Sequence, residues 1–339
     1  KGNYAETHYR DRGLQYPGHV KRNVYRQQEH YASASVLYVP MSILSVSFSS
    51  DYAYTMLSSN AIDVRRPWRH TMLESIAVKL GTDVFTTTAT LLAAIYKHGA
   101  EEGHGASDAR RLSPSLAFAW HPVHGRFSLR ASYKDIFRMP TFTDNYYTWM
   151  GNRNLRPEKA RQLNVGATVT GVREGRMRPR VEVRTDIYYN KVRDKIVAMP
   201  MNMFFWNMVN VGKVDIMGTD AGVSLSLQPS GWLRTELTAN YTYQYAVNVT
   251  SPSEKYYKDQ IAYTPRHSGG GSLALLTPWM NVSIHGTGMS RRYSTNENMD
   301  ITRLDAHHEL GIAAWREFGW DGIGLTLRAD VLNLTNEQY

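Results

Sequence analysis

Apolar and polar residues alternate along much of the chain, and the pattern is clearest on either side of a long loop within residues 126–172. Before the loop, the apolar positions are Leu129, Ala131 and Tyr133. After it, they are Leu163, Val165, Ala167 and Val169. A period of two places successive side chains on opposite faces of a β-strand. The pattern therefore predicts two strands joined by a loop that is rich in aromatic and basic residues.

The remainder of the chain repeats this unit, and about 14 strands are predicted in all. Long loops are expected at residues 57–68, 97–110, 136–159, 191–214, 247–264 and 291–301. Short connections fall between them, near residues 40, 82, 123, 175, 230, 278 and 318. Short turns at one end of the strands and long loops at the other are typical of an outer-membrane β-barrel.

The tryptophans lie near the expected ends of strands. Five lie beside predicted short turns: Trp120, Trp232, Trp279, Trp315 and Trp320. Three lie in predicted long loops: Trp68, Trp149 and Trp206. An indole ring prefers the headgroup layer of a membrane, where its ring is apolar and its N–H is hydrated. We therefore expect two aromatic girdles, one at each membrane surface.

Composition agrees with this interpretation. The 339 residues carry a formal net charge of +9 and have a mean hydropathy of −0.44. The chain has no apolar run of about 18 residues, which excludes a transmembrane helix but leaves a transmembrane barrel open. It contains no Cys, which removes disulfide and thiolate chemistry. Residues 1–10 lack the apolar core of a signal peptide, so we expect a processed protein or an internal portion of a longer one.

Five segments resemble, in order and in spacing, motifs of the TonB-dependent outer-membrane receptors. They are SYKDIFRMPTFTDNYY (132–147), GNRNLRPEKARQLNVG (151–166), TDIYYNKVRDKIV (185–197), NVGKVDIMGTDAGVSL (210–225) and VLNLTNEQY (331–339). The resemblance implies an all-β fold, an antiparallel transmembrane β-barrel of 22 strands filled by an N-terminal plug. Residues 1–339 would form part of that single barrel domain, with the plug, the early strands and the last strand outside this chain.

The same resemblance implies a function. Members of this family import scarce, bulky ligands such as siderophores, haem, cobalamin and some glycans. We expect this protein to import a metal chelate of the siderophore or cobalamin type across the outer membrane of a Gram-negative bacterium. The expected partners are the chelate, membrane lipid and lipopolysaccharide, a TonB-type energy-transducing protein that acts through the plug, and a surface lipoprotein lid. No nucleic-acid motif accompanies the basic charge, and no cofactor is expected.

Three other functions are alternatives to chelate import. They are a passive porin-like channel, a barrel enzyme such as a protease or lipase, and a haem or glycan receptor of the same family. The chain has no nucleophile elbow and no evident catalytic dyad, so no catalytic residue and no enzymatic activity are predicted. Haem receptors of the family that this chain resembles usually have a His in the segment between Arg138 and Asn154. No His occurs there in this sequence, so the resemblance disfavours haem.

The ligand-binding candidates lie in two long loops of neighbouring hairpins, whose tips can meet over the lumen. Aromatic rings and guanidinium groups can stack on and pair with an anionic chelate. The candidates are Tyr146, Tyr147, Trp149, Arg153, Phe204, Phe205 and Trp206. The competing interpretation is that these rings pack the loops together. Arg138 and Glu158 are expected to brace the loop against the barrel wall.

One loop offers side chains that could bind a metal ion. His98 and His104 flank two carboxylates, Glu101 and Glu102, and such groups can bind a metal ion. Their spacing matches no tight metal-binding motif. Solvated loop residues are the favoured interpretation, and no metal site is predicted.

Overall fold

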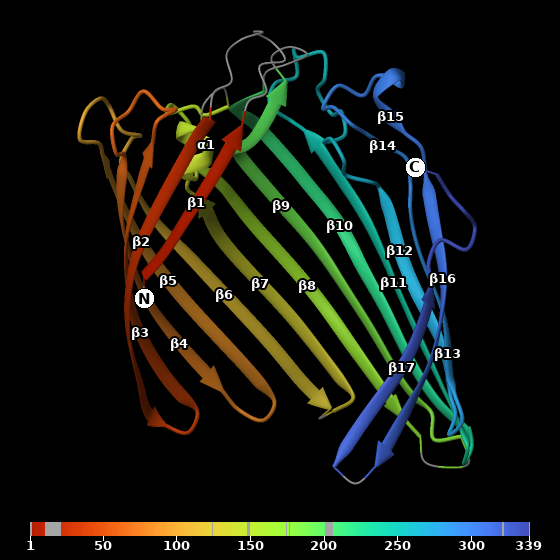
Figure 1. Cartoon of the computed structure of the whole chain (residues 1–339). Coiled ribbons are helices and arrows are strands. Elements are labelled where there is room, and N and C mark those ends of the chain that lie inside the picture. Colours follow the sequence, from red (N-terminus) through yellow and green to blue (C-terminus); the bar gives the residue numbers. More distant parts are fainter. Residues whose placement is uncertain are drawn as a thin grey trace.

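The computed structural model describes residues 2–10, 22–123, 125–147, 150–173, 175, 177–200, 206–320 and 322–338. Fifteen of the strands in these residues form one antiparallel sheet, and each strand pairs with its neighbours in chain order (Figure 1). They are β1 (Gly2–Arg10), β2 (Arg22–Met41), β3 (Leu44–Ser59), β4 (Trp68–Gly81), β5 (Phe85–Gly99), β6 (Ala109–Val123), β7 (Phe127–Arg138), β8 (Glu158–Val172), β9 (Arg180–Pro200), β10 (Trp206–Ser230), β11 (Leu233–Asn248), β12 (His267–Leu276), β13 (Asn281–Met289), β16 (His307–Trp320) and β17 (Ile323–Val331). A helix α1 (Phe142–Tyr146), a 3-10 turn η1 (Asp300–Thr302) and a small ribbon of β14 (Arg292–Tyr293) and β15 (Arg303–Leu304) lie in the loops.

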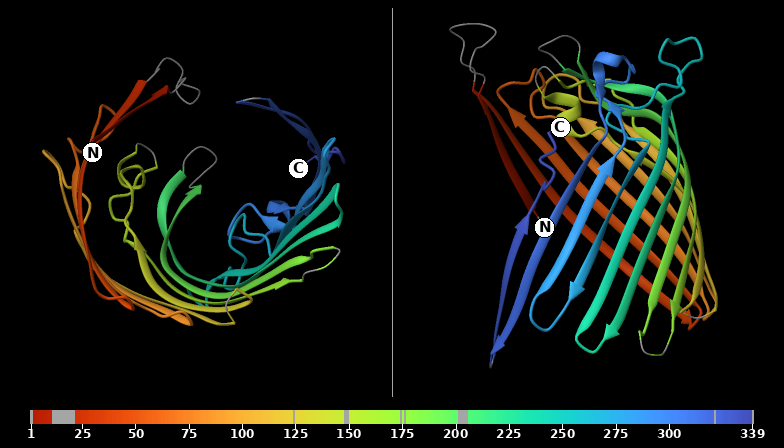
Figure 2. Two further views of the ribbon diagram at one scale, coloured as in Figure 1. Left: turned by 90° about the horizontal axis from the view of Figure 1, so that it is seen from below. Right: turned by 90° about the vertical axis from the view of Figure 1, so that its right-hand side faces the viewer.

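The sheet curls around a central space, with β1 and β17 as its two edges (Figure 2). The long loops gather at one end of the strands and the short turns at the other, as the connection lengths predict (Figure 1). The first end is called the loop end below, and the second the turn end. In the described residues, no helix is long and apolar enough to cross a membrane.

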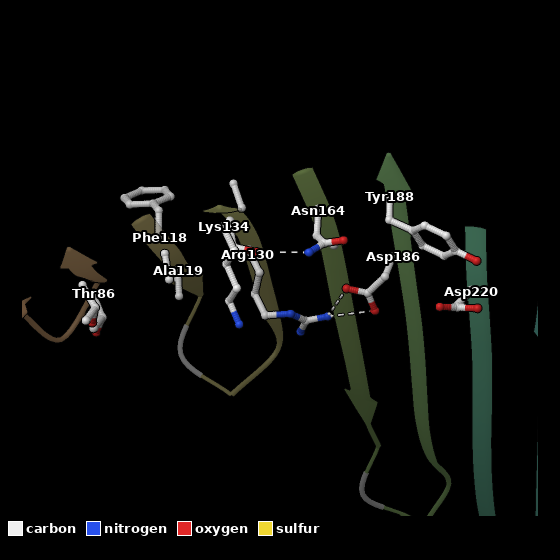
Figure 3. A pocket seen from close by; sticks show the side chains of 14 residues that line it. Thr86, Phe118, Ala119, Arg130, Lys134, Asn164, Asp186, Tyr188 and Asp220 are labelled. Atoms are coloured by element: carbon white, nitrogen blue, oxygen red, sulfur yellow. Dashed lines mark hydrogen bonds and ion pairs between the residues drawn. The ribbon is translucent and has the colours of Figure 1, made fainter. Parts of the chain in front are cut away.

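The two faces of the sheet differ in polarity. On the outer face, apolar side chains are exposed, with exposed fractions of 56% for Val165 and 62% for Ile187. The inner face carries polar and charged side chains such as Arg130, Asp186 and Asp220 (Figure 3). Such residues are costly in a dry protein core, but they are normal in the wet lumen of a membrane barrel. The alternation in the sequence therefore separates a lipid-facing surface from a lumenal one.

Aromatic residues lie at both ends of the strands. At the turn end, the exposed rings of Trp232 and Trp279 lie with their centroids 5.6 Å apart. Towards the loop end, the Tyr52 hydroxyl lies 2.6 Å from Nδ1 of His70, and Trp68 packs edge-on against the same imidazole. Trp315 was predicted to lie beside a short turn. Instead, it lies inside a strand, because β16 continues to Trp320.

One expected loop is wrong. Most of the segment 191–214 forms the upper parts of β9 and β10, which pair from Arg180 and Ser226 up to Pro200 and Trp206. Towards the loop end, the inner side of this segment packs into a buried cluster of Val192, Val214, Ala246 and Ile261. This packing extends the hairpin beyond the predicted end of the strands. The main sheet also has one strand more than the predicted count of about 14.

Candidate functional site

The loop between β7 and β8, residues 139–157, folds inward over the loop end of the barrel wall (Figure 2). The loop begins with α1. Thr141 and Asp144 cap the start of this helix, because the side chain of each accepts a hydrogen bond from the backbone N–H of the other. The Asp144 N–H donates to Thr141 Oγ1 at 3.1 Å, and the Thr141 N–H donates to Asp144 Oδ2 at 2.8 Å. This capping box fixes the direction in which the chain leaves β7.

Charged side chains from the barrel wall hold the base of this loop. Arg69 of β4 donates from Nη2 to the carbonyl oxygen of Pro140 at 2.5 Å, and its guanidinium lies 5.2 Å from the Phe142 ring centroid. Arg138 lies 3.6 Å from Asp144 and 3.5 Å from Glu158. Arg138 and Glu158 thus brace the loop, which agrees with their expected role.

An apolar cluster lies beneath α1 and joins it to the loops after β3 and β5. Its buried members are Tyr25, Leu57, Val64, Phe142 and Tyr146. The Tyr146 side chain is only 6% exposed, and its phenol oxygen accepts a hydrogen bond from the Ala106 N–H at 2.8 Å. Burial raises the pKa of Tyr146, so the phenol stays neutral. Tyr146 therefore anchors the loop and does not offer a free ring face.

Two other residues of this loop, Tyr147 and Arg153, are more accessible to solvent than Tyr146. Tyr147 is half-buried and stacks on Tyr25, with ring centroids 4.0 Å apart and an interplanar angle of 16°. Arg153 forms an ion pair of 3.0 Å with Asp63 and also donates to the carbonyl oxygen of His104 at 3.3 Å. The Arg153 and Asp63 side chains are 39% and 77% exposed. A pair as exposed as this contributes little stability, so an anionic ligand can compete with Asp63 for the guanidinium.

The β9–β10 hairpin meets the loop from the other side, as the arrangement of neighbouring hairpins predicts. The Met208 N–H donates to the carbonyl oxygen of Met150 at 2.8 Å, and Asn152 donates back to the carbonyl oxygen of Met208 at 3.0 Å. Asn210 accepts from the Arg156 N–H at 2.8 Å and donates to the carbonyl oxygens of Arg156 and Asp194 at 2.9 and 2.7 Å. One amide side chain therefore ties the loop to the hairpin.

The structure brings three of the predicted ligand-binding residues, Tyr146, Tyr147 and Arg153, into one folded loop. Trp149, Phe204 and Phe205 lie outside the described residues. Trp206 begins β10, and its side chain is likewise outside the described part. Sequence reasoning missed Arg69, Asp63 and Asn210, since nothing in the pattern around a lone Arg, Asp or Asn shows that it contacts a distant loop.

His98, Glu101 and Glu102 have other side-chain partners, and the carbonyl oxygen of His104 accepts a hydrogen bond from Arg153. His98 Nε2 lies 2.7 Å from Nε of Arg69, within the wall that supports α1. Glu101 and Glu102 instead form ion pairs with arginines of the loop after β3: Arg65 to Glu102 at 2.8 Å and Arg66 to Glu101 at 2.9 Å. In the described parts of the chain, no group of three or more His, Asp or Glu side chains is placed to hold a metal ion.

The inner face of the wall contains a hollow of about 520 Å³, which side chains of β5 to β10 line (Figure 3). Arg130 of β7 crosses over β8 and binds Asp186 of β9 with distances of 3.0 and 3.2 Å to the two carboxylate oxygens. It passes Gly166, where a Cβ would lie 1.9 Å from Asp186 Oδ1, so only glycine leaves room for the pair. Asp220, directly opposite Asp186, accepts a hydrogen bond from Thr242 at 2.6 Å.

Comparison with known proteins gives the same architecture. The model of the family described as "TonB dependent receptor-like, beta-barrel" matches residues 80–334. The chain is similar in fold to the copper transporter OprC (TM-score 0.78, 13% identity, 100% of this chain and 56% of that one). It is also similar to the FrpB iron transporter of Neisseria meningitidis, F3-3 variant (0.70, 14%, 99% and 55%), and to the unliganded ferric citrate transporter FecA (0.68, 14%, 100% and 54%). The chain thus spans about half the length of these structures.

Proposed function

Because this chain belongs to the TonB-dependent receptors of the Gram-negative outer membrane, we propose that the complete protein imports a scarce, bulky metal chelate of the siderophore or cobalamin type. The match of the β-barrel family model over residues 80–334 carries this proposal. The family consists of transporters, so the chain is not an enzyme. A TonB-type protein supplies the energy for import.

The fold supports import of a polar ligand. The inner face carries charged and hydroxyl side chains, among them Arg130, Asp186 and Thr242, which water and a hydrated chelate can contact. Structures that share this fold include transporters named for iron, ferric citrate and copper. All three names include a metal, which supports the proposal that the imported ligand contains a metal ion.

The outer ligand site lies on the loop 139–157 and the tip of the β9–β10 hairpin. Tyr147, Trp149 and the cluster Phe204, Phe205 and Trp206 provide rings that stack on the chelate, and Arg153 provides a positive charge for an anionic group. Tyr146 supports this surface from below, because its ring is buried. Each ring contributes on the order of 1 kcal/mol to binding.

Replacing Tyr147, Trp149, Arg153, Phe204, Phe205 and Trp206 together by Ala is expected to weaken binding of the cognate ligand at least tenfold. The measurement is binding of a panel of ferric siderophores, cobalamin and haem to the complete receptor in detergent. The control replaces Tyr256 and Tyr263 by Ala. Both are exposed tyrosines of the loop between β11 and β12. This variant is expected to bind the ligand as tightly as the unmodified receptor does.

Two outcomes oppose the proposal. If a panel member binds the substituted receptor as tightly as the unmodified one, these residues are not the ligand site. If no member binds and the protein instead lets small solutes leak from liposomes, the passive porin-like channel is the correct function.

A further inference from the structure

A carboxyl group lies on the lipid-facing side of the barrel wall. Glu74 of β4 pairs across the sheet with Ser50 of β3 and with Ala93 of β5. It has the same parity along β4 as Met72 and Ile76, whose side chains are 43% and 46% exposed on the outer face. The Glu74 side chain therefore points towards lipid, away from the lumen and from the proposed ligand site.

The depth of Glu74 places this carboxyl inside the apolar band of the membrane. Four residues nearer the loop end, the imidazole of His70 contacts Tyr52 and Trp68, and such aromatic side chains mark the membrane interface. Four residues rise about 13 Å along a strand, which at a tilt of about 45° is a depth of about 9 Å. An ionisable side chain at this depth is costly, and it generally marks a functional contact.

The protein itself gives this carboxyl little to bind. The Ser50 hydroxyl donates a hydrogen bond to Glu74 Oε1 at 2.8 Å. Among the described residues, no second group donates to Glu74 and no ion pair includes it. Phe48 and Ile76 form the next pair towards the turn end, and both are apolar. Polar atoms in hydrocarbon need hydrogen-bond partners, so the second carboxyl oxygen is left for a group from outside the wall.

A partner embedded in the same membrane can supply that group. β3 and β4 are interior strands of the sheet and each is paired on both sides, so what is open here is a face of the wall and not an edge (Figure 1). Acyl chains offer no hydrogen-bonding group at this depth. The partner must present a polar side chain at the same depth on its own lipid-facing surface. A second copy of this protein meets that condition, because both copies cross the membrane in the same orientation.

We propose that two copies of the protein pair through Ser50 and Glu74, about a two-fold axis along the membrane normal. Each Ser50 hydroxyl donates to the carboxyl of its own copy. Each Glu74, with its carboxyl protonated, donates from the second oxygen to the Ser50 oxygen of the other copy. These four hydrogen bonds close a ring and satisfy every polar atom of the four side chains. Ala34 and Ala93, the small neighbours in the same row, let the two walls approach closely.

Photo-crosslinking in intact cells shows which molecule lies against this surface. The photoreactive residue p-benzoylphenylalanine replaces Ala93 in the complete receptor. The control places it at Ala167 of β8, a lipid-facing alanine that pairs with Leu129 and Thr185 elsewhere on the wall. We expect a product of twice the receptor's mass, at least tenfold more abundant from position 93 than from position 167. Equal yields from the two positions, or a product with a different protein, would overturn the proposal.

Substitutions of Glu74 test the ring of hydrogen bonds, with native mass spectrometry of the complete receptor as the measure of dimer. Glu74→Leu is expected to lower the dimer fraction at least tenfold. Glu74→Gln is expected to keep the dimer, because an amide also donates and accepts in these positions. The control, Glu236→Leu, removes a carboxyl from the inner-face register of β11 and is expected to keep the dimer.

The heat-dependent shift in gel mobility shows that each of these variants has a folded barrel. A dimer that persists in Glu74→Leu would mean that the carboxyl is merely tolerated in lipid, and the proposal would be wrong. Loss of the dimer in Glu74→Gln would also refute the ring, since the amide preserves its hydrogen bonds. Loss in Glu236→Leu to the same extent as in Glu74→Leu would refute the assignment of the interface to the outer face of β3 and β4.

Discussion

Leu237→Arg is expected to destabilise the barrel by about 2–4 kcal/mol, because it places a guanidinium on the lipid-facing surface near the bilayer midplane. Leu237 lies directly between Leu225 and Leu273, and this outer row continues through Ile284 and Ile312. Every neighbour of the new charge across the strands is therefore apolar. Unfolding of the complete barrel in lipid vesicles, followed against denaturant concentration, measures the cost.

The adjacent substitution Thr238→Arg is the control, and it is expected to be much milder. Thr238 lies on the inner face opposite Ser224 and Ser272, and its hydroxyl is 2.8 Å from that of Ser272. A charge there meets the wet lumen and loses one exposed hydrogen bond. Equal destabilisation by the two arginines would show that the assignment of faces on β11 is incorrect.

Gly151→Ala is expected to lower ligand binding at least tenfold while the barrel stays folded. Gly151 lies against the end of α1, where a Cβ would be 2.7 Å from the backbone N of Tyr146 and 2.8 Å from the backbone C of Asn145. Backbone atoms cannot rotate away as a flexible side chain can, so the loop must move. This movement displaces both Tyr147 and Arg153 from the proposed ligand site.

The matched control is Gly231→Ala in the turn between β10 and β11, where an added Cβ has no atom within 4 Å. Both variants of the complete receptor are compared for binding of the cognate ligand and for cleavage of surface loops by protease in intact cells. Gly151→Ala is expected to bind weakly and to be cleaved faster in the loop 139–157. Normal binding by Gly151→Ala would exclude this loop from the site.

The membrane-spanning part of the fold is predictable from the sequence because lipid and lumen impose opposite polarity on alternate residues. Leu237 and Thr238 show this most simply, since each lies on the face that its polarity predicts. The long loops are likewise all at one end (Figure 1). The family motifs in residues 132–166 also located the loop that folds over the lumen.

The upper part of the β9–β10 hairpin was not predictable in this way, because the polarity pattern reverses there. Within the membrane, the apolar residues of β9 face outwards, as Ile187 does. Above it, Val192 faces inwards to the buried cluster while Lys191 and Arg193 face outwards. The outer face there is wet and the inner face packs against loops, so the phase of the alternation changes in mid-strand. For this reason the charged residues of segment 191–214 led to the prediction of a loop, although the segment mostly forms strands.

The proposed ligand site was only partly predictable. Its residue types indicated aromatic and cationic contacts, but burial depends on which loops meet. Tyr146 and Tyr147 are adjacent in the sequence and alike in chemistry, yet one is buried against Ala106 and the other stacks on Tyr25 at the edge of the cluster. Asn210 joins segments 54 residues apart, and no local pattern encodes such a contact.

Energised accumulation of a metal chelate by intact cells tests the central claim most directly. Cells that produce the complete receptor are supplied with radiolabelled ferric siderophores and cobalamin, with and without an uncoupler that collapses the proton-motive force. Import predicts that one chelate accumulates above its external concentration, only when the receptor is present and only without the uncoupler. Entry that stops at the external concentration and is unaffected by the uncoupler would contradict active import and show a passive channel.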